Sequence, residues 1–155
     1  MSFYRKKGYS EAWINQRIKS IEVQKALTDE WNRSRITESR DYAILTNEIT
    51  SAWNGKTVAE YKQHKGLKTE NLRDNMTNME LILNMLAEVT TTEISKAEKP
   101  QGMNESKKVA RRGGKVAGDA RKAIEQQTGK PVFSPLNAKE IGLLEGTAEE
   151  DAEEQ

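Results

Sequence analysis

Residues 104–129 read NESKKVARRGGKVAGDARKAIEQQTG, and this stretch combines a stripe of glycine and alanine with a band of lysine and arginine. Asn104 can cap a helix here, and Gly129 followed by Pro131 can end it. One side of the helical wheel carries small residues that let a second helix approach closely: Ala110, Gly113, Gly114, Ala117 and Gly118. The stretch therefore predicts a helix that lies against a partner, either another helix or a phosphate backbone.

The glycines of this stretch favour close packing. Gly113, Gly114 and Gly118 each cost about 1 kcal/mol of helix stability relative to alanine, so they need a packing or hinge role. We therefore expect a small-residue seam against the helix at residues 79–89, or against the copy of that helix in another protomer.

The basic residues of the same helix are the candidate contacts for a nucleic acid. They cover much of the remaining helix surface, and they are Lys107, Lys108, Arg111, Arg112, Lys115, Arg121 and Lys122. If nucleic acid binds, these side chains neutralise phosphates and read little sequence, so that affinity falls steeply with salt. A solvated basic face is the competing interpretation, because most charge runs on helices are solvated.

Charge is distributed unevenly along the 155 residues. The net charge is +1, but residues 145–155 hold six acids and no base, which leaves an excess of seven positive charges on the rest. Residues 99–130 alone carry nine Lys or Arg against three acids. This asymmetry indicates a polyanion partner, or an acidic tail that screens the basic face when no partner is bound.

Helical periodicity and capping signals predict an all-α fold, a small bundle of four to five helices. Its last, basic Gly/Ala-rich helix is extended, and we expect it to protrude or to be swapped. No segment alternates with period two for long enough to indicate a strand. The expected units are a basic N-terminal extension, a helical core, the basic helix and an acidic, largely disordered tail, at residues 1–9, 10–98, 99–131 and 132–155.

Within the core, capping boxes at Thr57 and Thr77 predict two helix starts, after helices at residues 10–32 and 39–53. The first helix has apolar residues on two faces, so we expect a kink near Ile21 or two packing partners. The helix that starts at Thr77 is dense in apolar residues and is expected to be the most buried one: Met79, Leu81, Ile82, Leu83, Met85, Leu86 and Val89.

Composition excludes several classes of protein. With 35% hydrophobic residues and a mean hydropathy of -0.86, the core is expected to be modest. There is no cysteine, and no apolar run approaches the roughly 18 residues that span a bilayer. The N-terminus lacks the apolar part of a secretory signal, so we expect a cytoplasmic protein with no membrane partner.

Signatures of catalysis are weak. His64 is the only histidine, which leaves the usual zinc sites and a Ser-His-Asp triad without support. The sequence Gly113-Gly114-Lys115-Val116 resembles a phosphate loop only faintly, because Val109 replaces its first glycine and Val116 its Ser or Thr. We expect no enzyme, no cofactor and no metal site.

Residues 58–76, VAEYKQHKGLKTENLRDNM, are a second candidate for DNA binding. They scan as a helix-turn-helix whose second helix would place side chains near bases: Lys68, Thr69, Asn71 and Arg73. Lys62 and Lys65, however, stand where the motif usually has small or apolar residues, so two ordinary short helices are the favoured interpretation. The three tryptophans are expected to anchor the core rather than to stack on bases.

Residues 8–129 resemble the C-terminal region of the DNA-damage-inducible protein D and Bro-N prophage antirepressor family. The blocks that carry the resemblance recur in order: GYSEAWINQRIKSI, ALTDEWNR, YAILTNEIT, EYKQHKGLKTENLRDNMTNMELI, TTEI and GGKVAGDARK. In that family a Bro-N domain usually precedes this region and is the part thought to bind DNA. Met1 lies just before the shared start, so the resemblance implies a chain that lacks Bro-N, and it supplies no catalytic residues.

Two hypotheses of function follow. The first, drawn mainly from the resemblance, is a non-enzymatic regulatory module that binds DNA through phosphate contacts, or binds a DNA-bound regulatory protein. The alternative is a homo-oligomerisation or protein-interaction scaffold without direct contact to nucleic acid.

Overall fold

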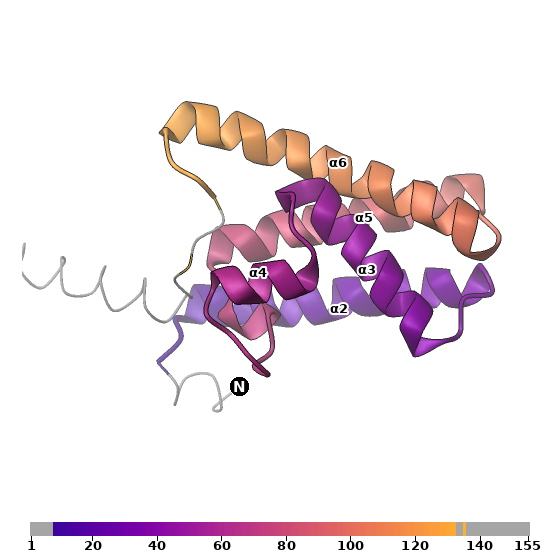
Figure 1. The fold of residues 1–155 in the computed structure, drawn as a ribbon, viewed down its shortest axis with the longest axis horizontal. Coiled ribbons are helices and arrows are strands. Elements are labelled where there is room, and N and C mark those ends of the chain that lie inside the picture. Colours follow the sequence, from indigo (N-terminus) through magenta and orange to yellow (C-terminus); the bar gives the residue numbers. More distant parts are fainter. Residues whose placement is uncertain (1–7, 133–134, 136–155) are drawn as a thin grey trace, which may run out of the picture.

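The protein is all-α, as the sequence predicts. The computed structural model describes residues 8–132 and 135, and this part contains five α-helices, one short 3-10 helix and no strand (Figure 1). These elements are α2 (Glu11–Arg33), α3 (Ser39–Asn54), α4 (Val58–His64), η1 (Arg73–Asn75), α5 (Asn78–Glu98) and α6 (Gly102–Thr128). The acidic residues 145–155 and most of the N-terminal extension lie outside the described residues.

Local hydrogen bonds explain where the helices begin. The capping boxes at Thr57 and Thr77 are confirmed: the backbone N–H of Glu60 donates to Thr57 Oγ1 at 3.2 Å, and that of Glu80 donates to Thr77 Oγ1 at 3.3 Å. The start expected at Asn104 is wrong, because α6 begins at Gly102. The cap residue is Gln101, three residues before Asn104, and its backbone N–H donates to Glu105 Oε2 at 2.6 Å.

Long-range contacts set the directions of the helices. Near the start of α2, Trp13 Nε1 donates to the carbonyl of Met76 at 2.8 Å, just before α5 begins. Near the end of α2, Ser95 Oγ donates to Glu30 at 3.3 Å, close to the end of α5. Helices α2 and α5 are therefore parallel neighbours. Helix α5 lies between α2 and α6 and also contacts α3, which crosses in front of it in Figure 1.

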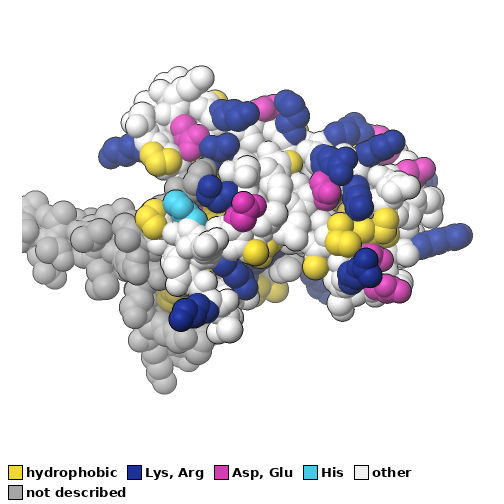
Figure 2. Space-filling model, in the orientation of Figure 1, with side chains coloured by type: hydrophobic (Ala, Val, Ile, Leu, Met, Phe, Trp, Pro, Cys, Tyr) yellow, Lys and Arg dark blue, Asp and Glu magenta, His cyan; other side chains and the backbone are white. Residues whose placement is uncertain are grey.

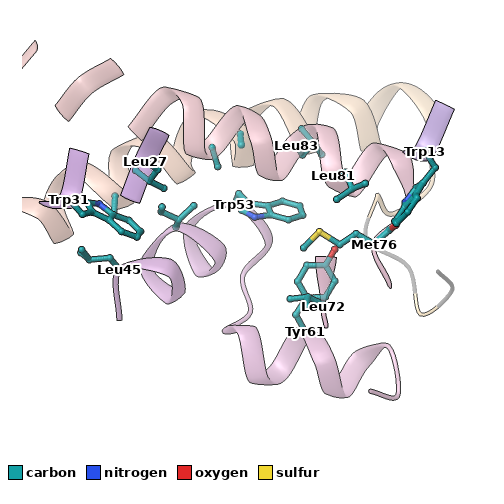
Figure 3. Packing of buried hydrophobic residues seen from close by; sticks show 14 of the residues in the cluster. Trp13, Leu27, Trp31, Leu45, Trp53, Tyr61, Leu72, Met76, Leu81 and Leu83 are labelled. Atoms are coloured by element: carbon teal, nitrogen blue, oxygen red, sulfur yellow. The ribbon is translucent and has the colours of Figure 1, made fainter. Parts of the chain in front are cut away.

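The tryptophans belong to the hydrophobic core, as expected. Trp13, Trp31 and Trp53 are buried, and Figure 3 shows their rings among the leucines of α2, α3 and α5. Trp53 also donates from Nε1 to Asn84 Oδ1 at 3.1 Å, which satisfies its polar edge inside the core. These rings are not available as platforms for stacked bases.

The first helix is not interrupted near Ile21. Helix α2 is one continuous element of 23 residues that packs along α5, and near its end Trp31 stacks on Tyr42 of α3 with ring centroids 5.8 Å apart. Ile21, where a kink was expected, is 50% exposed.

Helix α5 has the most buried residues of the described helices, as expected, but only part of its apolar residues face the core. Its core side is largely polar, with Glu80, Asn84, Glu88, Thr91, Thr92 and Ser95 all buried. Four of the apolar residues expected inside are exposed instead: Met79, Ile82, Leu86 and Val89. Leu81, Leu83 and Met85 are buried as expected. The other four are exposed because buried polar residues of a hydrogen-bonded network share the core side of α5 with these apolar ones.

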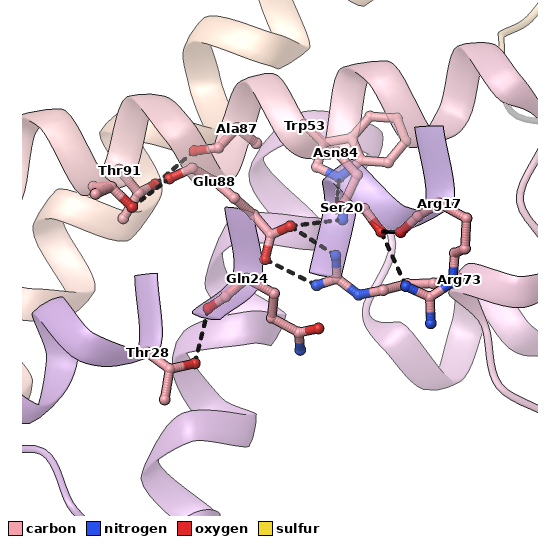
Figure 4. A network of polar contacts seen from close by, with 11 residues as sticks. Arg17, Ser20, Gln24, Thr28, Trp53, Arg73, Asn84, Ala87, Glu88 and Thr91 are labelled. Atoms are coloured by element: carbon pink, nitrogen blue, oxygen red, sulfur yellow. Dashed lines mark hydrogen bonds and ion pairs between the residues drawn. The ribbon is translucent and has the colours of Figure 1, made fainter. Parts of the chain in front are cut away.

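The centre of this network is an ion pair between η1 and α5 (Figure 4). Arg73 donates from Nη1 and Nη2 to the two oxygens of Glu88 at 2.7 and 2.8 Å, and Asn84 Nδ2 donates to Glu88 Oε1 at 3.2 Å. Burial disfavours the charge of Arg73, but the charge and hydrogen bonds of Glu88 outweigh it and raise the pKa of Arg73. The loop before α5 is thereby joined to the core.

Replacing Glu88 by alanine is expected to lower the free energy of unfolding by about 3–5 kcal/mol, because it leaves Arg73 buried without a counter-charge. The matched control is Glu93→Ala on the same helix, which removes an exposed pair with Lys96 and is expected to change stability by less than about 1 kcal/mol. Urea denaturation of both variants measures the difference. Equal effects would contradict a structural role of the buried pair.

Candidate nucleic-acid interface on helix α6

The small residues of α6 form its contact with the rest of the bundle. Ala110, Gly113, Gly114, Ala117 and Gly118 are all buried. A Cβ atom added at Gly113 would lie 2.8 Å from Thr91 Cα of α5, and one added at Gly118 would lie 2.7 Å from the carbonyl oxygen of Ala52 in α3. Such distances leave no room for a side chain, so α6 approaches both neighbours at backbone distance.

The small-residue seam of α6 meets two helices of the same chain. The sequence predicts that the seam meets the helix at residues 79–89 or the copy of that helix in another protomer, and it gives no sign of α3. In the structure, α5 and α3 of the same chain fill the seam on its two sides. Helix α6 is packed along the bundle rather than protruding from it or being swapped (Figure 1).

The arginines of α6 are engaged with acceptors on the protein itself. Arg111 Nε donates to Glu48 Oε2 of α3 at 2.7 Å, and Arg112 Nη1 lies 2.7 Å from Glu98 Oε2 of α5. Both arginine side chains remain more than half exposed. These pairs lower the charge that the arginines present to a partner without burying them.

Arg121 has a different place from the other candidates. Its side chain is only 14% exposed, its Nε donates to the backbone carbonyl of Trp53 at 2.7 Å, and its Nη1 donates to Glu125 at 2.7 Å. The Trp53 carbonyl lies at the end of α3, where helix carbonyls lack a partner within the helix. Arg121 therefore connects α6 to the end of α3, and it is poorly placed to reach a phosphate.

The lysines remain the most accessible cations. Lys108 and Lys122 are exposed, Lys107 is half-buried, and no acid in the described part of the chain forms an ion pair with any of the three. Lys115 is exposed and lies 2.9 Å from Asp119 one turn later. Figure 2 shows Lys and Arg along α6, with acidic side chains between them.

Helix geometry places four of these cations on one line. Lys108, Arg111, Lys115 and Lys122 are spaced by three, four and seven residues, so they share a face about 20 Å long. Gly113 and Gly114 direct the two inner faces toward α5 and α3, and the line is therefore the outer face of α6. We call it the cationic face.

The carboxylates beside this face are held in the charged form. Hydrogen bonds from Arg111 lower the pKa of Glu48, against the opposing effect of burial, and the charges of Arg111 and Lys107 add to the decrease. Hydrogen bonds from Arg112 and Lys115 likewise lower the pKa values of Glu98 and Asp119. Near neutral pH these acids continue to compensate their cations.

The helix-turn-helix interpretation of residues 58–76 is wrong. Helix α4 has only seven residues, and η1, with three, is the only helical element between it and α5. Residues 67–72 form no helix that can enter a major groove. Instead, Leu72 and Met76 anchor the connection to the core, and the Arg73 pair with Glu88 fixes it.

Other features of the described residues are less specific. His64 is exposed at the end of α4, and the described residues hold no cluster of acids or histidine with metal-binding geometry. A surface groove of about 620 Å³, which sequence reasoning missed, lies between α3 and α4 beside Val58, Lys62 and Leu67. In the described part, none of the helices has the length and apolar character needed to cross a membrane.

Gly118→Ala is expected to destabilise the protein by about 1–3 kcal/mol, because the added methyl overlaps the Ala52 carbonyl. In an exposed helix the same change would stabilise by about 1 kcal/mol, so the sign of the effect tests the close contact. Thermal and urea unfolding provide the measurement. Lys122→Ala, one turn away on the cationic face, is the control and should change stability by no more than about 0.5 kcal/mol.

Comparison with models of protein families gives a match over most of the chain. The model of the DinD C-terminal domain family matches residues 3–144, which is nearly the whole chain. Searches of curated proteins and of solved structures found no match. With its helical bundle and with this match over most of its length, the chain belongs to the DinD C-terminal domain family.

Proposed function

We propose that this chain is a non-enzymatic regulatory module that binds DNA through phosphate contacts along the cationic face of α6. The observation that supports this function is the line of cations on the outer face, of which Lys108 and Lys122 have no acidic partner among the described residues. Membership of the DinD family is consistent with a role in the response to DNA damage, in the cytoplasm. A DNA-bound protein with an acidic surface is a second possible partner for the same face.

The chemistry of the cationic face fits backbone contact better than sequence reading. Lysine carries a compact charge on a flexible stem, and it neutralises phosphates without the bidentate geometry that distinguishes bases. The arginines that have this geometry are engaged with Glu48 and Glu98. Binding through this face should therefore depend strongly on salt and weakly on DNA sequence.

Self-association is the alternative function, and a different observation favours it. The small-residue seam does not supply the interface, because α3 and α5 fill it. The exposed apolar residues of α5 provide another surface for a second copy.

A triple variant, Lys108→Glu, Lys115→Glu and Lys122→Glu, is expected to weaken DNA binding at least tenfold at low salt. Each lost phosphate contact should also reduce the slope of log K against log salt concentration by about 0.9. Fluorescence anisotropy with a short duplex at several salt concentrations measures both. Lys25→Glu on α2 is the control for a change of charge at a distant exposed site, and equal weakening in the control would contradict a localised interface.

Glu48→Gln combined with Glu98→Gln is expected to strengthen DNA binding about three- to tenfold. The substitutions release Arg111 and Arg112 from their carboxylates, and the loss of two negative charges raises the net charge around α6 by two. The same titration provides the measurement, with Glu22→Gln and Glu93→Gln as a matched double control on other helices. Unchanged affinity would show that the arginines do not face the bound DNA.

A further inference from the structure

Helix α5 carries an exposed apolar stripe in an otherwise polar molecule. Its members are Met79, Ile82, Leu86 and Val89, whose exposed fractions are 41, 38, 37 and 43%. They follow 3-4-3 spacing and therefore share one face of α5 over about 15 Å. This is the spacing of the seam of a coiled coil.

No helix of the described chain covers this face. Asn84 bonds to Trp53 and so marks the side of α5 that meets α3. Ile82 and Leu86 are each two residues from Asn84, about 200° around the helix, and they lie on the opposite side. Helices α2 and α6 occupy the two flanks of α5, which leaves the stripe between them open to solvent.

Helix α6 extends the stripe at one edge. Gly113 faces Thr91 of α5, and Gly114 faces α3. Val116 lies about 60° from Gly113 on the side away from Gly114, so it stands at the solvent edge of the α5–α6 contact, where it is 45% exposed.

We propose that this stripe is the interface between two copies of the chain, which pair α5 against α5 in antiparallel orientation. The inference deepens the second proposed function, self-association, and it does not depend on DNA binding. The stripe thus takes the role in self-association that was expected of the small-residue seam.

The amount of apolar surface suits such an interface. The five side chains leave about 350–400 Å² uncovered, at roughly 170–200 Å² for a fully exposed residue of this size, within the range of functional patches. A standard interface buries about 800 Å² per partner, of which about 55–65% is apolar. The stripe and Val116 supply most of the apolar part of such an interface, and the polar side chains around them supply its polar part.

The charges around the stripe favour a second copy over a polyanion. On α5 and on its neighbours α2 and α6, three ion pairs each set a cation beside an acid: Lys96 Nζ lies 3.9 Å from Glu93 Oε1, Lys19 Nζ lies 3.6 Å from Glu22 Oε2, and Arg112 Nη1 lies 2.7 Å from Glu98 Oε2. A two-fold axis brings the same border against itself, and a border of one sign would repel its copy. The border of the stripe is balanced, whereas the cationic face of α6 is not.

The spacing of the stripe decides the orientation. Because 3-4-3 reads the same in both directions, an antiparallel two-fold axis between Ile82 and Leu86 places Ile82 against Leu86 of the second copy. The same axis places Met79 against Val89 of the second copy. A parallel pair would instead set Glu93 against Glu93 and Lys96 against Lys96, which is unfavourable.

Sedimentation of the full chain over a range of concentrations, without DNA, tests the association. A reversible monomer–dimer equilibrium is expected, and Leu86→Glu should raise its Kd at least about 30-fold, the effect of losing a central contact. Helical content and unfolding temperature should stay close to those of the unchanged chain, because the Leu86 side chain lies at the surface.

Ile21→Glu is the matched control. Ile21 is also an exposed large apolar residue. In α2, Glu30 contacts Ser95 of α5. Ile21 lies nine residues before Glu30, so the two side chains are on opposite sides of α2. The control should leave the Kd unchanged. A chain that is monomeric at every concentration, or equal weakening by Ile21→Glu, would overturn the proposed interface.

Cysteine cross-linking tests the orientation, and the natural chain contains no cysteine to interfere. Under mild oxidation, a variant with Met79→Cys and Val89→Cys should form a disulfide-linked dimer, whereas either substitution alone should not. Efficient cross-linking of Val89→Cys alone would indicate a parallel pair and overturn the antiparallel arrangement. If the unchanged chain stays monomeric but still binds DNA with a strong salt dependence, this interface is rejected and the cationic face remains supported.

Discussion

The bundle depends on the close approach of α6 to two neighbours at once. At Gly113 and Gly118 even a methyl group would meet backbone atoms of α5 or α3 at less than 3 Å. Three glycines within six residues weaken an isolated helix, and the packing that they permit offsets this cost. Because both inner faces of α6 are occupied in this way, its remaining surface points to solvent, and the lysines on that surface are presented by a rigid element.

The buried polar residues of α5 are the second constraint on the fold. Glu88 neutralises Arg73 from the connection before α5, while Asn84 joins the same carboxylate to the indole of Trp53. Every member of such a buried network needs its partners in place, so the network fixes the rotation of α5 about its axis. That rotation directs Leu86 and its apolar neighbours outward. A core built from them would bury the stripe and expose the polar groups.

The two outer surfaces of the molecule differ in chemistry. The cationic face of α6 has more positive than negative charge, which suits phosphates, whereas the border of the α5 stripe is balanced and suits a copy of itself. The surfaces lie on different sides of the α5–α6 pair, so they do not compete. A dimer formed through α5 would carry two cationic faces, and the second phosphate contact would then be intramolecular, which increases overall affinity.

Local sequence signals determined much of this protein: the helical class, the capping boxes at Thr57 and Thr77, the burial of the tryptophans and the small-residue side of α6. Those features depend on hydrogen bonds within a few residues or on spacing along one helix, and both can be read from the order of residues. The tertiary structure alone decided which helices fill the seam, which cations are engaged by acids, and which apolar side of α5 faces outward. The partners Glu48 and Arg111 are 63 residues apart, and no local pattern connects them. Helix α5 has two candidate inner faces, and only the hydrogen-bond partners that α3 and η1 supply make its polar face the buried one.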